Sequence, residues 1–379
     1  MAFLMEAEEY SSAKLTWHPE ALLAFLKESL AMLRERQGCS SEKSSWWPFL
    51  HTAVRELPEK IRLFMAGKYQ FSPMLKYPTP GEMVLVWQHL DRLFIRALLY
   101  ILKPLFPHLI SPQVFHLQGP SGVQSALSYV RKGLDKHRFR YFFRIDIKSY
   151  YASINHDILL AQIETAFKDI RVKQYLKSIV TIAHLQDGAI EVPTQGIPRR
   201  SSLSPLFGAL YLAPLDKHFS KTPGILYARY MDDMIVLTKT KRQYVRAKKA
   251  IKQILTALKL QVSRKKTKMG LLTKGFHFLG VEFQYSGASA PQSGSETQIQ
   301  PCQTQVLHAR SCKRALTRVQ LMNENSVHPE HLQSYLVRWV SWWSRTASLF
   351  RSHCLTRWVE VASLKDAPLV WLGTGLTRL

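Results

Sequence analysis

The sequence predicts a mixed α+β fold, and three features of the chain support this. Two β-prone apolar runs flank Asp232 and Asp233 within residues 225–238, which is the pattern of a hairpin. Another apolar run leads into Asp146, as a strand would. Helical spacing of apolar residues dominates residues 1–65, 311–323 and 330–350.

Residues 1–65 are expected to form amphipathic helices that extend the fold at its N-terminal side. Their apolar side chains recur at helical spacing: Trp17, Leu22, Leu23, Phe25, Leu26, Leu30 and Leu33. We interpret this pattern as packing surface rather than as a functional site.

Asp146 is predicted to stand at the end of a strand. Asn155 is placed to cap a helix over residues 157–166. Further along, residues 194–205 form a Gly-containing basic loop that ends with Ser204 as N-cap and Pro205 at the first helical position. A largely buried helix is expected over residues 206–219.

Asp232 and Asp233 are predicted at the tip of a tight hairpin, with both carboxylates pointing toward a metal. An Asp-Asp pair between strands is usually a solvated turn, but here it follows a strand-end aspartate and a basic loop. Phosphoryl transfer to a growing chain uses two divalent metals roughly 4 Å apart. Three carboxylates supply the oxygen ligands that Mg²⁺ prefers. Gln195 and Gly196 would then lie against an incoming nucleotide.

These motifs, in this order, resemble those of bacterial reverse transcriptases of the group II intron-like kind, a family with stand-alone, defence-associated members. The resemblance covers residues 68–345. Its motifs, from the opening fingers segment to the primer-grip hairpin, are residues 67–73, 91–94, 115–126, 146–151, 195–205, 230–233, 258–267 and 276–283. It implies a right-hand polymerase of fingers, palm and thumb, with the N-terminal helical segment as an addition.

The resemblance also implies catalytic roles. Asp146, Asp232 and Asp233 would be metal-binding carboxylates that hold two Mg²⁺ ions, with Mn²⁺ as an alternative. Lys266 matches the basic residue that assists pyrophosphate departure, although in so basic a segment a contact with the nucleic-acid backbone is an equal alternative.

A nucleotide pocket is implied by the same match. Tyr151 falls where the family places a steric gate against a ribose 2′-OH, with ordinary core packing as the alternative. Met231 would pack against the primer end and the nucleotide. The complete implied set is Ile147, Tyr151, Gln195, Gly196, Arg199, Arg200 and Met231.

Arg199 and Arg200 enter this set through a departure from the family pattern. Residues 77–87 contain no Lys or Arg, although relatives present a basic pair there for the triphosphate. We therefore predict that Arg199 or Arg200 contacts the triphosphate. The basic cluster within residues 131–140 is the alternative.

The charge balance predicts a polyanionic partner. The chain carries 52 Lys and Arg against 27 Asp and Glu. Twelve Lys or Arg and no acid lie between Lys239 and Lys268, whereas a solvated helix usually interleaves both signs. Nucleic-acid binding should therefore depend strongly on salt.

Membrane and disulfide chemistry are not expected. No apolar run reaches the roughly 18 residues of a spanning helix. The N-terminus lacks the basic region of a secretory signal, so a cytoplasmic location is predicted. The four cysteines lack the paired spacing of a zinc site, and we expect them to be reduced: Cys39, Cys302, Cys312 and Cys354.

Composition divides the remaining chain into three parts. Residues 66–283 would hold fingers and palm. Residues 284–303, rich in Ser and Gly, would form a flexible linker. Residues 304–379 would supply a helical thumb and C-terminal region.

The predicted function is RNA-directed DNA synthesis, with dNTPs as substrates, an RNA template and a DNA product. A dedicated non-coding RNA is the candidate template, and antiphage defence is the candidate role. Template-independent or protein-primed synthesis at the same site is one alternative. A non-catalytic RNA-binding or splicing factor is another, but such a protein has no need of three carboxylates facing a polyanion. Template, primer and homo-oligomerisation stay open.

Overall fold

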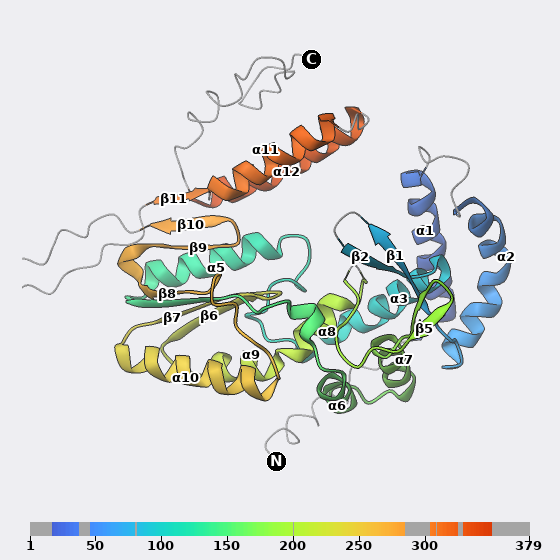
Figure 1. Ribbon diagram of the computed structural model, residues 1–379, viewed down its shortest axis with the longest axis horizontal. Coiled ribbons are helices and arrows are strands. Elements are labelled where there is room, and N and C mark those ends of the chain that lie inside the picture. Colours follow the sequence, from blue (N-terminus) through green and yellow to red (C-terminus); the bar gives the residue numbers. More distant parts are fainter. Residues whose placement is uncertain are drawn as a thin grey trace, which may run out of the picture.

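The computed structural model describes residues 17–37, 46–79, 82–199, 201–284, 304–307, 309–324 and 329–350. Within these residues, helices surround three β-sheets, which is the mixed arrangement that the sequence predicts (Figure 1). No helix in these ranges is both long and apolar enough to cross a membrane.

A four-stranded antiparallel sheet, the central sheet, carries the candidate site. Its order is β6 (Ile225–Tyr230), β7 (Asp233–Thr238), β3 (Tyr141–Ile145) and β8 (Lys268–Leu271). Residues 234–237 of β7 are fully buried because helices cover both faces of the sheet. A strand buried on both faces reads as a continuous apolar run, as this one does.

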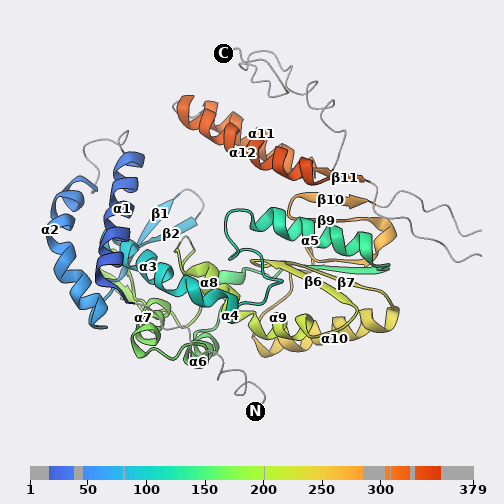
Figure 2. The same cartoon turned by 180° about the vertical axis from the view of Figure 1, so that it is seen from behind.

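Different helices cover the two faces of the central sheet (Figures 1 and 2). Helix α5 (Gly122–Lys136) packs on one face, against β6. Helices α9 (Ala213–Ser220) and α10 (Lys241–Ala257) pack on the other. Helix α8 (Ser204–Tyr211) and helix α6 (His156–Ala166) lie beside each other at the end of the sheet nearer α3.

A second four-stranded sheet lies in the N-terminal lobe. Its order is β2 (Glu82–Val86), β1 (Met74–Thr79), β4 (His184–Gln186) and β5 (Ala189–Glu191), with β1 and β4 parallel. The lobe's helical elements are α1 (Pro19–Gln37), α2 (Trp46–Met65), α3 (His89–Leu102), η3 (Lys103–Leu105), α4 (Phe106–Leu109) and α7 (Ile170–Val180).

The predicted primer-grip hairpin is present as β9 (Phe276–Phe278) and β10 (Val281–Gln284), and β11 (Thr304–Leu307) adds a third strand. After it come α11 (Ala309–Glu324) and α12 (Pro329–Phe350), on the α5 side of the central sheet (Figures 1 and 2). Both helices were expected from the sequence. The predicted linker, residues 284–303, falls outside the described residues except for its first position.

The N-terminal helices pack, as predicted, rather than standing apart. Leu22 and Leu26 of α1 join the same buried cluster as Phe64 and Phe94. The Trp17 indole N–H donates to Asp169 Oδ2 over 3.1 Å, which ties the start of the segment to α7. Helices α1 and α2 therefore share one core with the lobe that follows.

Two local predictions around α8 were wrong. Ser204 is the first helical residue rather than the cap, and its hydroxyl donates to the Pro198 carbonyl. The helix expected over residues 206–219 is broken at Leu212, since Pro214 at the second position of α9 has no N–H to continue it. The predicted helix after Asn155 is correct, because the Asn155 side chain accepts from the Ile158 N–H over 3.2 Å.

Candidate active site

Asp146 and Asp232 come to the same end of the central sheet. Asp146 directly follows β3, as predicted, and its backbone N–H donates to Thr267 Oγ1 over 3.3 Å. Asp232 is in the two-residue turn between β6 and β7, because Tyr230 pairs with Asp233. The hairpin thus holds one carboxylate at its tip and places the other at the start of β7. The expectation of both at the tip was wrong by one residue.

Asp233 is held by an arginine. Arg144 Nε donates to Asp233 Oδ1 over 3.0 Å and Arg144 Nη2 donates to Oδ2 over 3.2 Å, a two-point ion pair. Arg144 also contacts His277 Nε2. Burial raises the pKa of Asp233, and the guanidinium opposes that shift. Each carboxylate oxygen accepts one hydrogen bond from Arg144, which leaves one lone pair on each oxygen for a metal.

Asp232 and Asp146 share one electrostatic environment. Burial raises the pKa of Asp232, its own backbone N–H lowers it, and the charge on Asp146 raises it again. Lys266 opposes this repulsion, with its Nζ 3.7 Å from Asp146 Oδ1 and its side chain 71% exposed. The structure therefore brings Lys266 to the carboxylates, as the sequence predicted.

This pair fits a hard divalent cation. Two half-buried carboxylates that repel each other are stabilised by a positive ion between them, and their oxygens are ligands that Mg²⁺ accepts. Among the residues described, no group of three or more His, Cys, Asp or Glu side chains is arranged to hold a metal. Protein ligation by two carboxylates is the usual way for Mg²⁺, which keeps waters and substrate phosphates in its remaining positions.

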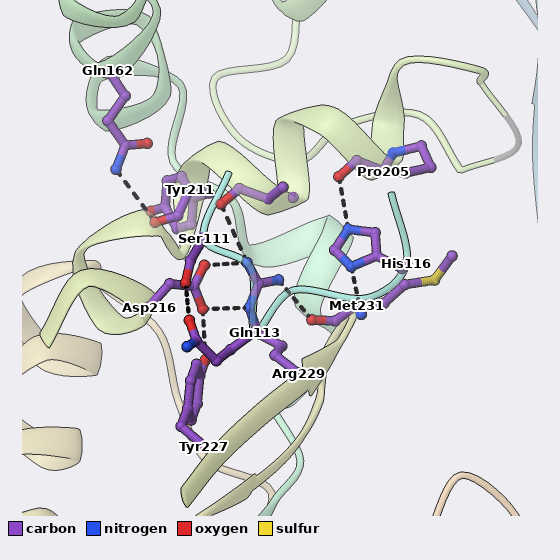
Figure 3. Close-up of polar contacts among 12 residues, drawn as sticks. Ser111, Gln113, His116, Gln162, Pro205, Tyr211, Asp216, Tyr227, Arg229 and Met231 are labelled. Atoms are coloured by element: carbon purple, nitrogen blue, oxygen red, sulfur yellow. Dashed lines mark hydrogen bonds and ion pairs between the residues drawn. The ribbon is translucent and has the colours of Figure 1, made fainter. Parts of the chain in front are cut away.

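The turn that carries Asp232 has an unfavourable backbone conformation. Met231 has φ of 55°, a region that costs an L-residue roughly 1–2 kcal/mol. Two side chains hold its peptide groups (Figure 3). The Met231 N–H donates to His116 Nδ1 over 3.0 Å, and Arg229 Nη1 donates to the Met231 carbonyl over 2.9 Å. We call His116 and Arg229 the turn clamp.

His116 joins the turn to α8. Since Nδ1 accepts from Met231, the ring proton lies on Nε2 and donates to the Pro205 carbonyl over 3.1 Å (Figure 3). Burial and the charge on Arg229 together lower the pKa of His116 to about 3. The neutral imidazole therefore satisfies both backbone groups in one tautomer.

Arg229 is fully buried beneath the turn. Its Nε donates to Asp216 Oδ1 over 2.7 Å, and its Nη2 pairs with Oδ2. Tyr227 donates its hydroxyl to Asp216 Oδ1 over 2.6 Å. A buried guanidinium needs such a partner, because an uncompensated charge in the interior is costly. The Asp216 pair thus fixes the side chain whose third nitrogen reaches Met231.

Tyr151 belongs to the short helix η4 (Tyr150–Ser153) and lies beside Asp232. Burial raises the pKa of Tyr151 to about 12, and the Asp232 charge contributes in the same direction. Gly208 of α8 allows the close packing here, since a Cβ atom on it would lie 3.2 Å from Tyr150 and 3.5 Å from Tyr151. The aromatic ring is half-buried, so it still presents a surface next to the carboxylate.

The loop that contains Gln195 and Gly196 is fastened to the Tyr151 segment. The Gly196 N–H donates to the Ile154 carbonyl over 2.7 Å, and the Ile197 N–H to the Tyr151 carbonyl over 2.8 Å. Gly196 has φ of 86°, which glycine adopts without strain. Tyr151, Gln195 and Gly196 are thus brought together as predicted, and Gln195 is exposed.

The structure places the remaining predicted nucleotide-binding residues in different environments. Ile147 is 2% exposed, belongs to the core and pairs through its backbone with Val262, so the structure buries this predicted residue. Arg199 is exposed, and its charge lowers the pKa of Asp232, which places it near the site. Arg200 lies outside the described residues.

The alternative basic cluster of residues 131–140 is at the wrong end of the sheet. It precedes Tyr141, which pairs with Thr238 at the end of β7 remote from Asp233. Six residues of extended chain, about 20 Å at ~3.3 Å per residue, separate Arg140 from Asp146. A triphosphate at the carboxylates would not reach this cluster.

Sequence reasoning missed the turn clamp and Arg144. Arg229 offered a signal, because a charged residue inside an apolar run must find a partner when the strand is buried. His116 offered none, since it binds backbone groups of Met231 and Pro205, which are remote in sequence.

Comparisons with known proteins identify a family that the chain matches. Residues 82–283 match the family described as reverse transcriptase (RNA-dependent DNA polymerase). Protein YkfC of Escherichia coli K12 is 22% identical, over 50% of this chain and 60% of YkfC. Group II intron-encoded protein LtrA of Lactococcus lactis subsp. cremoris is 24% identical, over 34% of this chain and 21% of LtrA. The chain thus aligns with less than two thirds of the length of either protein.

Among solved structures, apo telomerase from Candida tropicalis is similar, with a TM-score of 0.41 and 17% identity. The match covers 57% of this chain and 47% of that one.

Proposed function

We propose that this chain, which belongs to the reverse transcriptase (RNA-dependent DNA polymerase) family, copies an RNA template into DNA. The observation that carries the proposal is the convergence of Asp146 and Asp232 at one end of the central sheet, beside Tyr151 and the Gly196 loop.

Asp146 and Asp232 are the proposed metal-binding pair. Reverse transcriptases generally use divalent metal ions; a pair of Mg²⁺ ions, or Mn²⁺, would stabilise the attacking and leaving oxygens of the transfer. Asp233 supports the pair through Arg144, which it holds in a two-point contact beside His277. Direct ligation by Asp233 would use the lone pairs that Arg144 leaves free.

Lys266 is the proposed basic group for the leaving pyrophosphate. Its ammonium lies near the Asp146 carboxylate yet is mostly exposed, so it can follow a phosphate without losing buried contacts. Arg199, which is exposed and near Asp232, is the proposed partner of the triphosphate, alone or together with Arg200. A guanidinium suits this role because it binds phosphate oxygens through two parallel donors.

Tyr151 is the proposed sugar gate. Its ring packs on Gly208 and lies next to Asp232, so a 2′-OH on a nucleotide at the carboxylates would meet the ring. Gln195 and Gly196 would contact the nucleotide from the fastened loop, whereas Ile147 would support Asp146, the residue before it, from the core. The turn clamp would keep Asp232 directed at the reacting atoms.

Primer extension tests the proposal. The full chain, an RNA template with an annealed DNA primer, dNTPs and Mg²⁺ should yield DNA complementary to the template, and Asp146→Asn should yield none while binding the RNA normally. Product of random sequence, or product formed without template, would favour template-independent synthesis. RNA binding without any extension by the wild-type chain would favour a non-catalytic RNA-binding protein.

For the biological role, we propose synthesis on a dedicated non-coding RNA in antiphage defence, on the resemblance to stand-alone defence-associated enzymes. Sequencing the nucleic acid that copurifies with the chain tests the template. Plating phage on cells with the wild-type chain or Asp232→Asn tests the role. Equal plaque numbers on both strains would contradict it.

A further inference from the structure

Helix α10 has two faces of opposite character. Ala247, Ile251 and Leu255 are buried on the side that packs against β3 and β7. The other side is exposed and carries cations in two rows, which are Lys241, Lys248 and Lys252 in one and Arg242, Arg246 and Lys249 in the other. We call these six residues the α10 basic face.

Repulsion among the cations of the α10 basic face destabilises the helix when no ligand is bound. Arg242 and Arg246, and likewise Lys248 and Lys252, are four positions apart, where like charges destabilise a helix. No acid occurs between Lys239 and Lys268 to relieve this repulsion. The helix forms nonetheless, because its apolar side is buried and Thr240 and Gln243 make a capping box at its start. A polyanion on this face would remove the repulsion.

The face lies away from the candidate active site. Helix α10 packs on the face of the central sheet opposite to the one that carries α5, β9 and β10 (Figures 1 and 2). Asp146 and Asp232, by contrast, are at the ends of strands. A nucleic acid on α10 therefore needs a second region of contact, apart from the strand held at the carboxylates.

We propose that the α10 basic face binds the phosphate backbone of double-stranded RNA, the RNA being inferred from the proposed function. The helix is 17 residues long, about 25 Å at 1.5 Å per residue, so its rows can follow a backbone over several phosphates. Duplex RNA is recognised mainly through its shape and its phosphates and sugars, for which fixed rows of cations suffice.

A single strand fits the face less well. Binding of unpaired bases relies on exposed aromatic rings. The aromatic residue of α10, Tyr244, stacks on Phe143 with ring centroids 4.3 Å apart, so its ring is used in packing. The face thus offers charge without a stacking surface.

A membrane also fits less well. A helix that binds in a membrane interface needs an apolar face opposite its cations. The apolar side of α10 is covered by the central sheet, and Val245 is the exposed large apolar side chain on the helix. The charge pattern therefore favours a rigid polyanion in solution.

The test uses the full chain with Lys248→Gln, Lys249→Gln and Lys252→Gln combined. A matched control removes three cations elsewhere, by Lys27→Gln, Arg55→Gln and Lys60→Gln on α1 and α2. Binding of a blunt 20-base-pair RNA duplex is titrated at several salt concentrations. Parallel titrations use single-stranded RNA and vesicles with anionic lipid. Incorporation of one nucleotide on a short primer–template measures the active site.

The α10 variant should bind the duplex at least about tenfold more weakly at physiological salt, and its salt dependence should fall by about one unit of slope per lost phosphate contact. The control and the incorporation rate should stay near wild type. Unchanged duplex binding, an equal loss in the control, or a loss confined to single strands or vesicles would overturn the proposal. Failure of the wild-type chain to incorporate nucleotide would count against the proposed function instead.

Discussion

Replacing His116 should separate positioning of the catalytic turn from stability of the fold. His116→Ala removes two hydrogen bonds, from the Met231 N–H over 3.0 Å and to the Pro205 carbonyl over 3.1 Å. Each lost bond leaves a partly buried backbone group unsatisfied, which costs about 1–3 kcal/mol where water does not replace the bond. We therefore expect the free energy of unfolding to fall by about 2–5 kcal/mol. This figure adds the cost for the two groups and allows for the small net value of each hydrogen bond.

The effect on rate should exceed what stability explains. Met231 would lose one of the two side chains that hold its positive φ, and Asp232 is the next residue. A displacement of a reacting group by about 1 Å can cost about 100-fold in rate. We therefore expect kcat to fall by about that factor under conditions where the variant is still folded, with a smaller change in KM.

Two conservative variants distinguish positioning from packing. The His116→Asn carbonyl can take the place of Nδ1 and accept from Met231, whereas the His116→Gln amide can take the place of Nε2 and donate to Pro205. Urea unfolding measures stability, and single-turnover incorporation measures rate. Asn should restore the rate better than Gln even if both restore stability equally. Equal rates for the two variants, or a wild-type rate for His116→Ala, would refute the reasoning.

Three further predictions concern single side chains. Tyr151→Val should raise ribonucleotide incorporation relative to deoxyribonucleotide in competition assays, because the ring that meets the 2′-OH is lost; an unchanged ratio would make Tyr151 a core residue. Arg199→Ala, alone or with Arg200→Ala, should raise KM for dNTP more than the Kd for RNA at one fixed salt; equal losses would leave the triphosphate without an assigned partner. Asp216→Asn should lower the free energy of unfolding by about 3–5 kcal/mol, because the buried Arg229 guanidinium loses its counter-charge. A loss under about 1 kcal/mol in urea titration would show that water or another group compensates.

Much of the central sheet was predictable because its strands bury both faces and read as apolar runs. The hairpin around Asp232, the strand before Asp146 and the helix after Asn155 followed from local patterns that the structure keeps. The break at Leu212 was missed, although Pro214 marks it, because the apolar period continues through that point.

The site was predictable as a set of residues and less so as a geometry. Motif order pointed to Tyr151 and the Gln195–Gly196 loop, which the structure fastens together, and Tyr151 lies near Asp232. The contact of Arg144 with Asp233 depends on strand register, since these residues belong to strands that are paired but distant in sequence. Register is set by the whole sheet rather than by either segment.

The two adjacent aspartates provide the most direct test of the proposed chemistry. Single-turnover nucleotide incorporation on an RNA template should be compared for Asp232→Asn and Asp233→Asn. Asp232 lies beside Asp146, whereas both oxygens of Asp233 are bonded to Arg144. Loss of a supporting residue around a metal typically costs about 10–100-fold, so Asp233→Asn should fall within that range and Asp232→Asn should lose more than about 100-fold, with RNA affinity unchanged in both. A rate for Asp232→Asn within a few-fold of wild type, or a larger loss for Asp233→Asn, would contradict the assignment of Asp146 and Asp232 as the metal-binding pair.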